Sequence, residues 1–337
     1  MRNLLLAITI PLVLAATVAQ AQIVPNLGGQ RVGISSLQFL KIGIGGRGAA
    51  LGESMAAIAN DASALYWNPA GLVLTNDNAV IVSHAEWLVE LKHDFAGVMY
   101  HLTSADAIGV SVISLVTDDM PVTTETQPLG TGTFFRYSDL ALGLTYSRKM
   151  TSQFSFGTTI RYVQENLASV KITGVLFDLG TFYSLGIGSS RIGVVVSNFG
   201  SDVAPKGTVE LLDHSTVNTF QSFSPPTVFK IGFAFEPLED EAQKITTSIQ
   251  LNHPNDNAEN VRLGCEYVWE NWMFLRVGLK RTIGEPLFGA AQKSADDYSF
   301  GAGVFVPVGL TDVKFDYAFT HFNELSAVHR ISVEFTY

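Results

Sequence analysis

The chain ends on eight residues, 330–337, that alternate between polar and apolar side chains. An extended strand places Ile331, Val333, Phe335 and Tyr337 on one face and Arg330, Ser332, Glu334 and Thr336 on the other. A terminal strand that is apolar on one side, charged on the other and closed by an aromatic residue is typical of a membrane barrel with lipid outside and water inside. We interpret Phe335 and Tyr337 as a C-terminal insertion signal, whose partner would be the barrel-assembly machinery.

The same pattern recurs along the chain from Ala79 onward, with turn signals between the runs. We predict strands at 79–88, 93–102, 106–116, 137–149, 154–166, 170–185, 190–199, 227–236, 243–252, 259–270, 272–281, 298–307, 311–320 and 329–337. The expected fold class is therefore all-β, a transmembrane antiparallel β-barrel of about 14 strands, with twelve or sixteen left open. The third and seventh strands are apolar on both faces, which indicates that something packs against them inside the barrel.

The predicted connections differ in length in an ordered way. Every second connection is short, whereas the other set includes every long one: 117–136, 200–226 and 282–297, with 321–328 intermediate. Outer-membrane barrels have this arrangement, with tight turns on the periplasmic side and longer loops outside. Aromatic residues near the predicted strand ends would form girdles at the two membrane interfaces, among them Trp87, Tyr100, Tyr137, Trp269, Trp272 and Tyr337.

The N-terminus has the form of a secretory signal peptide, residues 1–21. Arg2 precedes an apolar stretch, and Ala19-Gln20-Ala21 is a small-residue cleavage site. The exported chain would reside in the outer membrane of a Gram-negative-type bacterium, surrounded by its lipid. Its formal net charge of −10 argues against a nucleic-acid partner, and its single cysteine, Cys265, excludes an internal disulfide.

Residues 22–78 differ from the barrel sequence that follows them at 79–337. A glycine-rich run, 39–53, precedes an alanine-rich run, 54–72, and small residues can pack tightly inside a barrel. We interpret 22–78 as a small helical or irregular plug, or hatch, in the lumen. The glycines at 43, 45 and 48 match a dinucleotide-binding fingerprint, but nothing downstream reads as a βαβ unit, so we expect no cofactor.

The plug sequence also carries a family resemblance. One run contains Gly45, Gly46, Arg47 and Gly48, and a second contains Asn60, Asp61, Asn68, Pro69, Ala70 and Gly71. Together they closely resemble the N-terminal region of the PorV/PorQ family and, more distantly, the hatch of FadL-type outer-membrane transporters. The resemblance implies a fourteen-stranded barrel with this segment inside. It further implies either cargo handling in type IX secretion or lateral passage of hydrophobic molecules into the membrane.

Catalytic and metal-binding constellations do not stand out in the sequence. The seven histidines are scattered, and no G-x-S-x-G elbow occurs. We expect a non-enzymatic protein without a metal; the enzyme alternative is an outer-membrane phospholipase, which would need a lipid-facing Ser–His pair. The charges predicted to face the lumen have both signs: Arg161, Lys244, Arg262, Glu266, Arg276, Lys280, Asp312, Lys314, Asp316, Arg330 and Glu334. They would hold the plug or, alternatively, line a path for a polar solute.

Our preferred interpretation is a PorV/PorQ-type barrel that acts in protein export as a component or cargo adaptor, meeting secretion-system or cargo proteins at its long loops. The 200–226 loop is unusually apolar, which suggests that it folds over the barrel mouth or meets a partner. The alternative is a FadL-like transporter of a hydrophobic ligand, with Gly174 and Gly180 as candidate sites of a gap in the wall. A plain porin is the third interpretation.

Overall fold

The computed structural model describes residues 34–75, 77–211, 215–283, 296–322, 325 and 327–337. The predicted signal peptide, the first part of the predicted plug (22–33) and most of the predicted loop 282–297 lie outside the described residues. Within the described part of the chain, no helix has both the length and the apolar character needed to cross a membrane.

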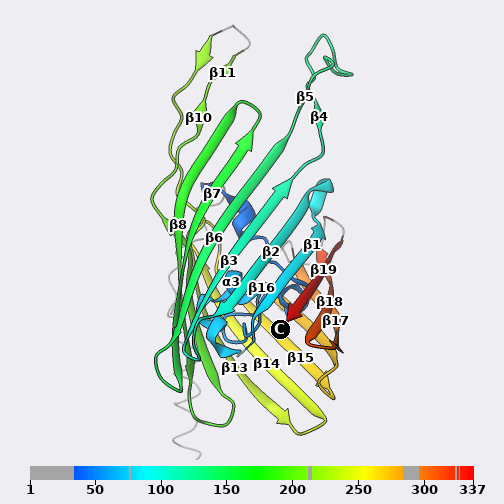
Figure 1. Ribbon diagram of the computed structural model, residues 1–337. Coiled ribbons are helices and arrows are strands. Elements are labelled where there is room, and N and C mark those ends of the chain that lie inside the picture. The colour runs from blue at the N-terminus through cyan, green and yellow to red at the C-terminus, as the bar shows by residue number, and fades with distance from the viewer. Residues whose placement is uncertain (1–33, 76, 212–214, 284–295, 323–324, 326) are drawn as a thin grey trace, which may run out of the picture.

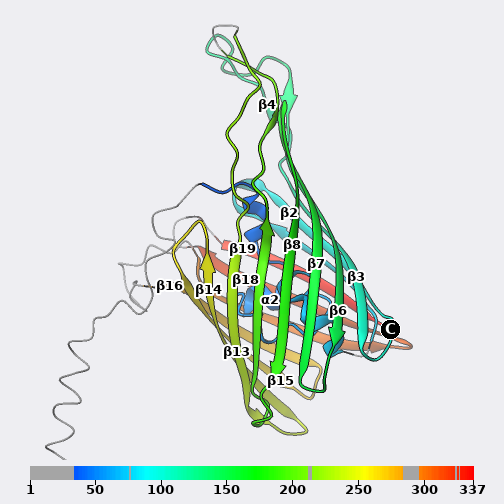
Figure 2. The same cartoon turned by 90° about the vertical axis from the view of Figure 1, so that its left-hand side faces the viewer.

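A single antiparallel β-sheet closes on itself to form the body of the molecule (Figures 1 and 2). Its wall strands are β1 (Ala79–Glu86), β2 (Lys92–His101), β3 (Asp106–Val116), β6 (Tyr137–Lys149), β7 (Phe154–Leu167), β8 (Val170–Ser184), β9 (Arg191–Gly200), β13 (Val228–Glu239), β14 (Gln243–Pro254), β15 (Asn260–Trp269), β16 (Met273–Thr282), β17 (Asp296–Val308), β18 (Thr311–Phe322) and β19 (Ala327–Thr336). The sheet counts fifteen strands because the short β10 (Lys206–Gly207) also pairs with the upper end of β8. The last strand, β19, pairs with the full length of β1, which closes the ring.

The closed fourteen-strand barrel confirms the predicted fold class, and the predicted strand ranges agree with the observed ones to within three residues. Side chains alternate between the two faces of the wall as the sequence pattern predicts. On β19, Ile331 is 55% exposed on the outer face, whereas Arg330 is 2% exposed on the inner face. The inner face of the doubly apolar strand β3 carries Ile113 and Leu115, which are buried in the interior core.

Two of the predicted girdle aromatics belong to the interior. Trp87 packs edge-on against buried Phe322, with ring centroids 5.3 Å apart, in a small inner cluster. Tyr137 packs against the main interior core, and its hydroxyl donates to Asp139 at 2.7 Å. Trp87 lies just beyond the end of β1, and Tyr137 is the first residue of β6. The prediction was wrong for these two because the strand alternation does not fix the direction of a side chain at such ends. By contrast, Tyr100, Trp269, Trp272 and Tyr337 are exposed.

The long connections gather at one end of the barrel, the upper end in Figure 1. There the hairpin formed by β4 (Met120–Pro121) and β5 (Phe134–Phe135) rises far above the wall, as does the segment with β10, β11 (Val209–Glu210) and β12 (Thr216–Val217). The short connection from β1 to β2 contains the turn η3 (Leu88–Glu90). The opposite end carries short turns, among them 102–105 and 150–153.

The segment that precedes the wall lies inside the barrel. We use the word plug for its described residues, 34–75. It contains η1 (Gln38–Lys41), α2 (Gly46–Ala50), α3 (Ala64–Trp67) and η2 (Pro69–Leu74). Its apolar side chains form one core with inward residues of the wall, so that Leu51, Met55 and Leu72 have no exposed surface.

Candidate functional site

Glycines line the inner wall where main-chain or side-chain atoms of the plug touch it. They are Gly97, Gly109, Gly157, Gly180, Gly193, Gly232, Gly264, Gly278 and Gly301, and the atoms nearest to the missing Cβ of each include atoms of the plug. Six of them form cross-strand pairs, 157 with 180, 193 with 232 and 264 with 278. A Cβ at position 193 would lie 1.9 Å from the carbonyl oxygen of Ala56, so the plug and the wall fit only because these side chains are absent.

Polar side chains of the wall satisfy main-chain groups of the plug at the same level. The Gly46 N–H donates to the Ser332 hydroxyl at 2.9 Å, and the Ala56 N–H donates to the Gln250 amide oxygen at 2.8 Å. The Ser155 hydroxyl donates to the Ala70 carbonyl at 2.9 Å. An irregular segment in a closed lumen needs such partners because its main-chain groups cannot all bond to one another.

The Asn-Pro-Ala-Gly turn at 68–71 is built into this contact. Asn68 has no exposed surface; its side-chain oxygen accepts the Ala70 N–H at 3.1 Å, and its amide donates to the Ala56 carbonyl at 2.7 Å. The same amide donates to the Thr181 carbonyl of β8 at 3.1 Å. Pro69 then begins η2, where its fixed φ is favourable. The turn therefore both caps η2 and fastens it to the wall.

Arg47 connects the plug motif to the charged side of the wall. Its guanidinium donates to Asp61 at 2.6 Å, to Asn60 at 2.8 Å and to both carboxylate oxygens of Glu266 on β15 at 3.1 Å. Burial alone would raise the pKa of Asp61, but the charges of Arg47 and Lys314, together with hydrogen bonds from Ser63 and Arg47, outweigh it and lower that pKa to about 2. Sequence motif residues 47, 60 and 61 thus meet in one cluster, in which Arg47 and Asp61 are buried and Asn60 is exposed.

The cluster continues into the wall as a chain of alternating charges. Arg276 donates to Glu266 at 2.5 Å and to Asp316 at 2.6 Å, and Lys314 lies 3.9 Å from Asp316. Arg262 forms a separate ion pair with Glu53 of the plug. These contacts link strands β15, β16 and β18 to one another and to the plug.

The remaining predicted charges take several places. Arg161 pairs with Asp178 at 2.6 Å, and Glu334 accepts the Ala62 N–H at 3.2 Å. Lys244 pairs with Glu239 at 2.8 Å near the lower rim. Arg330 is buried and lies over the Trp87 ring, 4.8 Å from its centroid. Lys280 and Asp312 are half-buried.

Sequence reasoning missed three anionic partners: Glu53, Asp178, and Asp256, which pairs with Lys41 of the plug at 2.9 Å. It also missed Lys230, a 9% exposed residue whose ammonium lies 5.9 Å from the centroid of the Tyr66 ring. For Asp178 the signal was available, since Asp178 alternates with outward Phe177 and Leu179 on a predicted strand.

The two glycines proposed as sites of a wall gap are both covered from inside. A Cβ at Gly180 would lie 2.1 Å from the Asn68 side-chain oxygen, and a Cβ at Gly174 would lie 2.8 Å from the Val203 side chain. The register of β8 against β9 does shift between Phe177 and Leu179. There the Asp178 carboxylate accepts the Asn198 N–H at 2.6 Å, so the irregularity is closed by hydrogen bonds.

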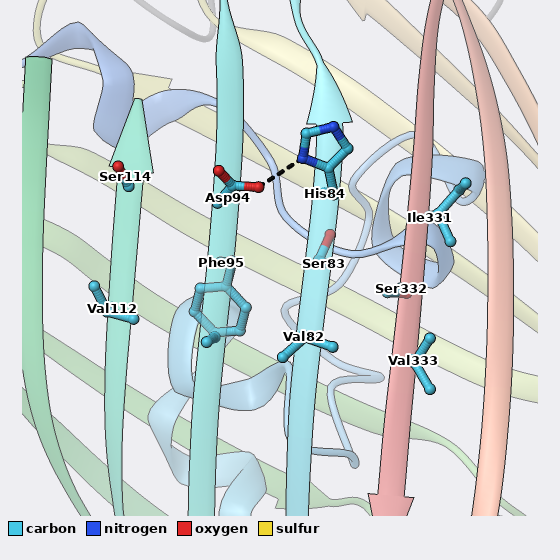
Figure 3. A pocket seen from close by; sticks show the side chains of 11 residues that line it. Val82, Ser83, His84, Asp94, Phe95, Val112, Ser114, Ile331, Ser332 and Val333 are labelled. Atoms are coloured by element: carbon cyan, nitrogen blue, oxygen red, sulfur yellow. Dashed lines mark hydrogen bonds and ion pairs between the residues drawn. The ribbon is translucent and has the colours of Figure 1, made fainter. Parts of the chain in front are cut away.

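A groove of about 420 Å³ crosses β19, β1, β2 and β3 on the outer wall (Figure 3). Two outward-facing rows of cross-strand neighbours border it. The row nearer the loop end is Ile331, His84, Asp94 and Ser114, and the other is Val333, Val82, Ala96 and Val112. Between them lie the inward residues Ser332, Ser83 and Phe95.

His84 and Asp94 are hydrogen-bonded at 2.6 Å in this groove, and their side chains are 53% and 52% exposed. Ser114 lies beyond Asp94, on the side away from His84 (Figure 3). A serine triad places the imidazole between the hydroxyl and the carboxylate, so this order does not provide a general base for Ser114. Among the described residues, no group of His, Cys, Asp or Glu side chains is arranged to hold a metal ion.

The connection 201–227 has two parts: a base at the rim of the barrel and a part that projects above the rim. At its base Val203 is buried, and its N–H donates to the Phe223 carbonyl at 2.9 Å. Beyond this pair the segment rises above the mouth, as the β4–β5 hairpin does on the opposite side in Figure 1. Apolar side chains are exposed on both projections: Leu129 is 99%, Phe134 65% and Leu211 44% exposed.

Comparison with known proteins bears on this arrangement. A family model described as type IX secretion system protein PorV matches residues 26–254. No curated protein matches the chain. Among solved structures, a Pseudomonas aeruginosa FadL homologue is similar with a TM-score of 0.60 and 12% identity, over 88% of this chain and 98% of that one.

Two further solved structures share the fold. The monoaromatic hydrocarbon channel CymD has a TM-score of 0.59 and 14% identity, over 87% of this chain and 97% of its own. The Ralstonia pickettii toluene transporter TbuX has a TM-score of 0.57 and 12% identity, over 88% of this chain and 97% of its own. At these identities the likeness concerns the fold alone.

Proposed function

The chain belongs to the PorV family of type IX secretion system proteins, and on this premise we propose that it is a plugged outer-membrane barrel that serves protein export. It acts as a component or cargo adaptor of the export machinery, through binding and not through chemistry. Its signal peptide is removed near Ala21, and the barrel-assembly machinery inserts it through the C-terminal strand.

The observation that carries this proposal is the contrast between a filled lumen and the two projections above it. The plug is fastened to the wall through main-chain contacts at glycines and through the buried Arg47 cluster, which leaves little freedom for passage through the centre. The projections instead present exposed apolar side chains, including Leu129 at 99% exposure, above the membrane. Exposed apolar residues at such a place favour recognition of another protein.

The test uses the native protein and a matched pair of positions. Leu129 on the loop side and Leu310 in a turn at the opposite end are both 99% exposed. We expect Leu129→Ser, combined with replacement of 208–219 by a short Gly-Ser linker, to remove secretion-system proteins from an affinity purification out of native outer membranes. The linker retains the Val203–Phe223 pair at the base of the segment. Leu310→Ser should change nothing, and unchanged recovery of these proteins by the loop variant would refute the proposal.

A second candidate function is transport of a hydrophobic small molecule, in the manner of the FadL-like alternative. Its support is the shared fold with proteins described as a toluene transporter and a monoaromatic hydrocarbon channel. This function predicts fatty acid or hydrocarbon bound to the purified barrel and uptake of labelled hydrocarbon by vesicles that contain it. Uptake equal to that of empty vesicles would eliminate it.

A further inference from the structure

The hairpin of β1 and β2 ends at the loop end of the barrel in a two-residue turn (Figure 1). The Leu91 N–H donates to the Leu88 carbonyl at 3.4 Å, and the two residues between them, Val89 and Glu90, have left-handed φ angles of 57° and 61°. This is the geometry of a type I′ turn, which strongly favours sequences such as Asn-Gly because both central residues need a positive φ. The residues of this turn therefore contradict the preference of its geometry.

Val89 is the residue that fits the turn least, because a left-handed conformation is an outlier for a β-branched side chain. Among the left-handed residues other than glycine in the described part of the chain, Val89 is the only β-branched one. Its side chain is nevertheless 88% exposed, so no packing within the protein compensates for the strain. Strain of this kind at an exposed apolar residue indicates a use outside the molecule.

The chain on both sides of the turn is held firmly. Leu88 packs with Trp87 against the small inner cluster that contains Phe322, and Leu91 packs against the main interior core. The Trp87 N–H also donates to the Leu91 carbonyl at 2.6 Å. Strained residues persist only where their surroundings determine the backbone, and here both flanking leucines do so. The Val89 side chain is therefore presented in a fixed position, which lowers the entropy cost of burying it in a partner.

The charge around the turn is negative. Glu86, at the end of β1, and Glu90, in the turn, are both exposed. Lys92 lies opposite Glu86, but its ammonium donates to the Asp118 carboxylate at 2.7 Å. Three carboxylates against one ammonium favour a cationic surface on whatever meets the turn.

The same ion pair connects the turn to the surface that we propose for export partners. Asp118 lies in the connection that leads from β3 into the β4–β5 hairpin, and this connection carries the exposed Leu129. The contact between Lys92 and Asp118 joins the base of this projection to the β1–β2 hairpin. The turn and the projection thus belong to one surface at the loop end.

We propose that Val89 is a contact residue for the export partner and enters an apolar socket that is bordered by Lys or Arg side chains on the partner protein. The inference rests on the proposed function and adds one defined contact to it. The occupant is a protein and not the membrane interior, because the turn lies beyond the exposed charges of Glu86 and Lys92 that end the two strands on the loop side.

The test uses the full mature chain, purified by affinity from native outer membranes, and compares recovery of the secretion-system proteins that the wild type captures. Val89→Thr keeps the β-branched shape and the strain but replaces a methyl group by a hydroxyl. We expect it to lower recovery at least about fivefold. The urea midpoint of the purified barrel should not change, because the side chain lies at the surface.

A double variant separates strain from contact. Val89→Asn combined with Glu90→Gly gives the turn its favoured sequence, so it should raise the urea midpoint. The same variant removes the apolar side chain and one charge, and we expect it to lower recovery at least about tenfold. A gain in stability together with a loss of binding is the combined result that a merely tolerated irregularity would not give.

The matched control is the β15–β16 turn at the opposite end of the barrel. Its central residues, Glu270 and Asn271, have φ angles of 44° and 60°, so it contains the same left-handed pair. Glu270→Asn combined with Asn271→Gly should also raise the urea midpoint but leave recovery at the wild-type level. Glu90→Gln tests the basic border of the socket, because its recovery should fall less than that of the wild type as salt rises from about 50 to about 500 mM.

The outcomes that contradict the inference are distinct. Equal recovery by the wild type, Val89→Thr and the double variant at 89–90 would overturn the contact, and a lower urea midpoint in that double variant would overturn the strain. Equal salt dependence of the wild type and Glu90→Gln would overturn the basic border. A purified barrel that dimerises by itself, and loses the dimer in Val89→Thr, would show that the occupant is a second copy of the chain.

Failure of this inference can be separated from failure of the proposed function. A wild type that recovers no secretion-system protein refutes the export function and the contact that rests on it. A wild type that recovers these proteins, with equal recovery by both variants at position 89, refutes the contact alone. Heat-modifiable migration on gels reports that each variant is a folded barrel.

Discussion

Gly52 of the plug lies directly against Gly278 of β16: a Cβ at position 278 would come within 1.9 Å of the Gly52 amide nitrogen. Gly264 is the cross-strand neighbour of Gly278, and a Cβ at position 264 would come within 2.9 Å of the Leu51 carbonyl oxygen. The main chain of the plug is thus seated on the main chain of two adjacent strands. These main-chain contacts hold the plug in position without relying on any single side chain.

The seat at Gly278 predicts a strong response to a single side chain. Gly278→Leu should destabilise the folded barrel by about 1–3 kcal/mol, because overpacking forces the plug or the wall to shift. The matched control is Val277→Leu, since Val277 is 55% exposed on the outer face of the same strand. Urea unfolding in detergent, followed by tryptophan fluorescence, measures both. Equal stabilities of the two variants would contradict this prediction, because they would show that the plug moves aside without a loss of stability.

The Arg47 cluster predicts a non-additive pair of substitutions. Arg47→Ala should cost about 3–5 kcal/mol, because it leaves Asp61 and one side of Glu266 buried without their cation. Combining Arg47→Ala with Asp61→Ala should recover part of that loss, since the orphaned carboxylate is removed too. The same unfolding assay gives the coupling free energy, and a value near zero would mean that the two residues do not depend on each other.

Acidification gives an independent view of the same pair. The pKa of Asp61 is lowered from 3.8 to about 2, so its ionised form contributes stability above pH 3.8. That contribution should persist unchanged from pH 7 to pH 4.5 and disappear as the pH falls through about 2. Stability of the wild type and of Asp61→Asn, compared across this range, should therefore converge below pH 3.8. Convergence already at pH 5 would contradict the assignment.

The C-terminal strand predicts a defect of assembly rather than of stability. Phe335 is 40% and Tyr337 55% exposed on the outer wall, so neither holds the interior together. The double variant Phe335→Ala with Tyr337→Ala should reduce the inserted fraction in cells several-fold, while the barrel refolded in detergent keeps wild-type stability. Phe315→Ala, at a 50% exposed outward site on β18, is the control. Normal insertion of the double variant would rule out the signal.

Alternation in the sequence was sufficient to predict the wall, because most strands carry apolar side chains on the outer face and polar ones on the inner face. It predicted that Arg276 and Asp316 face inward, since each stands between outward apolar neighbours. It did not predict that they touch. That contact depends on the register of β16, β17 and β18, which side-chain type does not encode.

The glycines of the wall likewise have contacts that the sequence pattern does not predict. In the sequence nothing distinguishes Gly157 from the other glycines of the wall, and Gly180 is a candidate site of a gap. Their meaning depends on Pro69 and Asn68, distant in sequence, which fill the space that the missing side chains leave. The plug motif and the wall glycines are two halves of one contact, and only the folded chain brings them together.

The seam between β1 and β19 makes an assembly order testable. The plug immediately precedes β1, and β1 pairs with β19, the last strand of the described wall. We therefore expect residues 34–75 to enter the barrel before or while these two strands pair. A wall that closed earlier would leave the apolar residues Leu51, Met55 and Leu72 without the core in which they are buried.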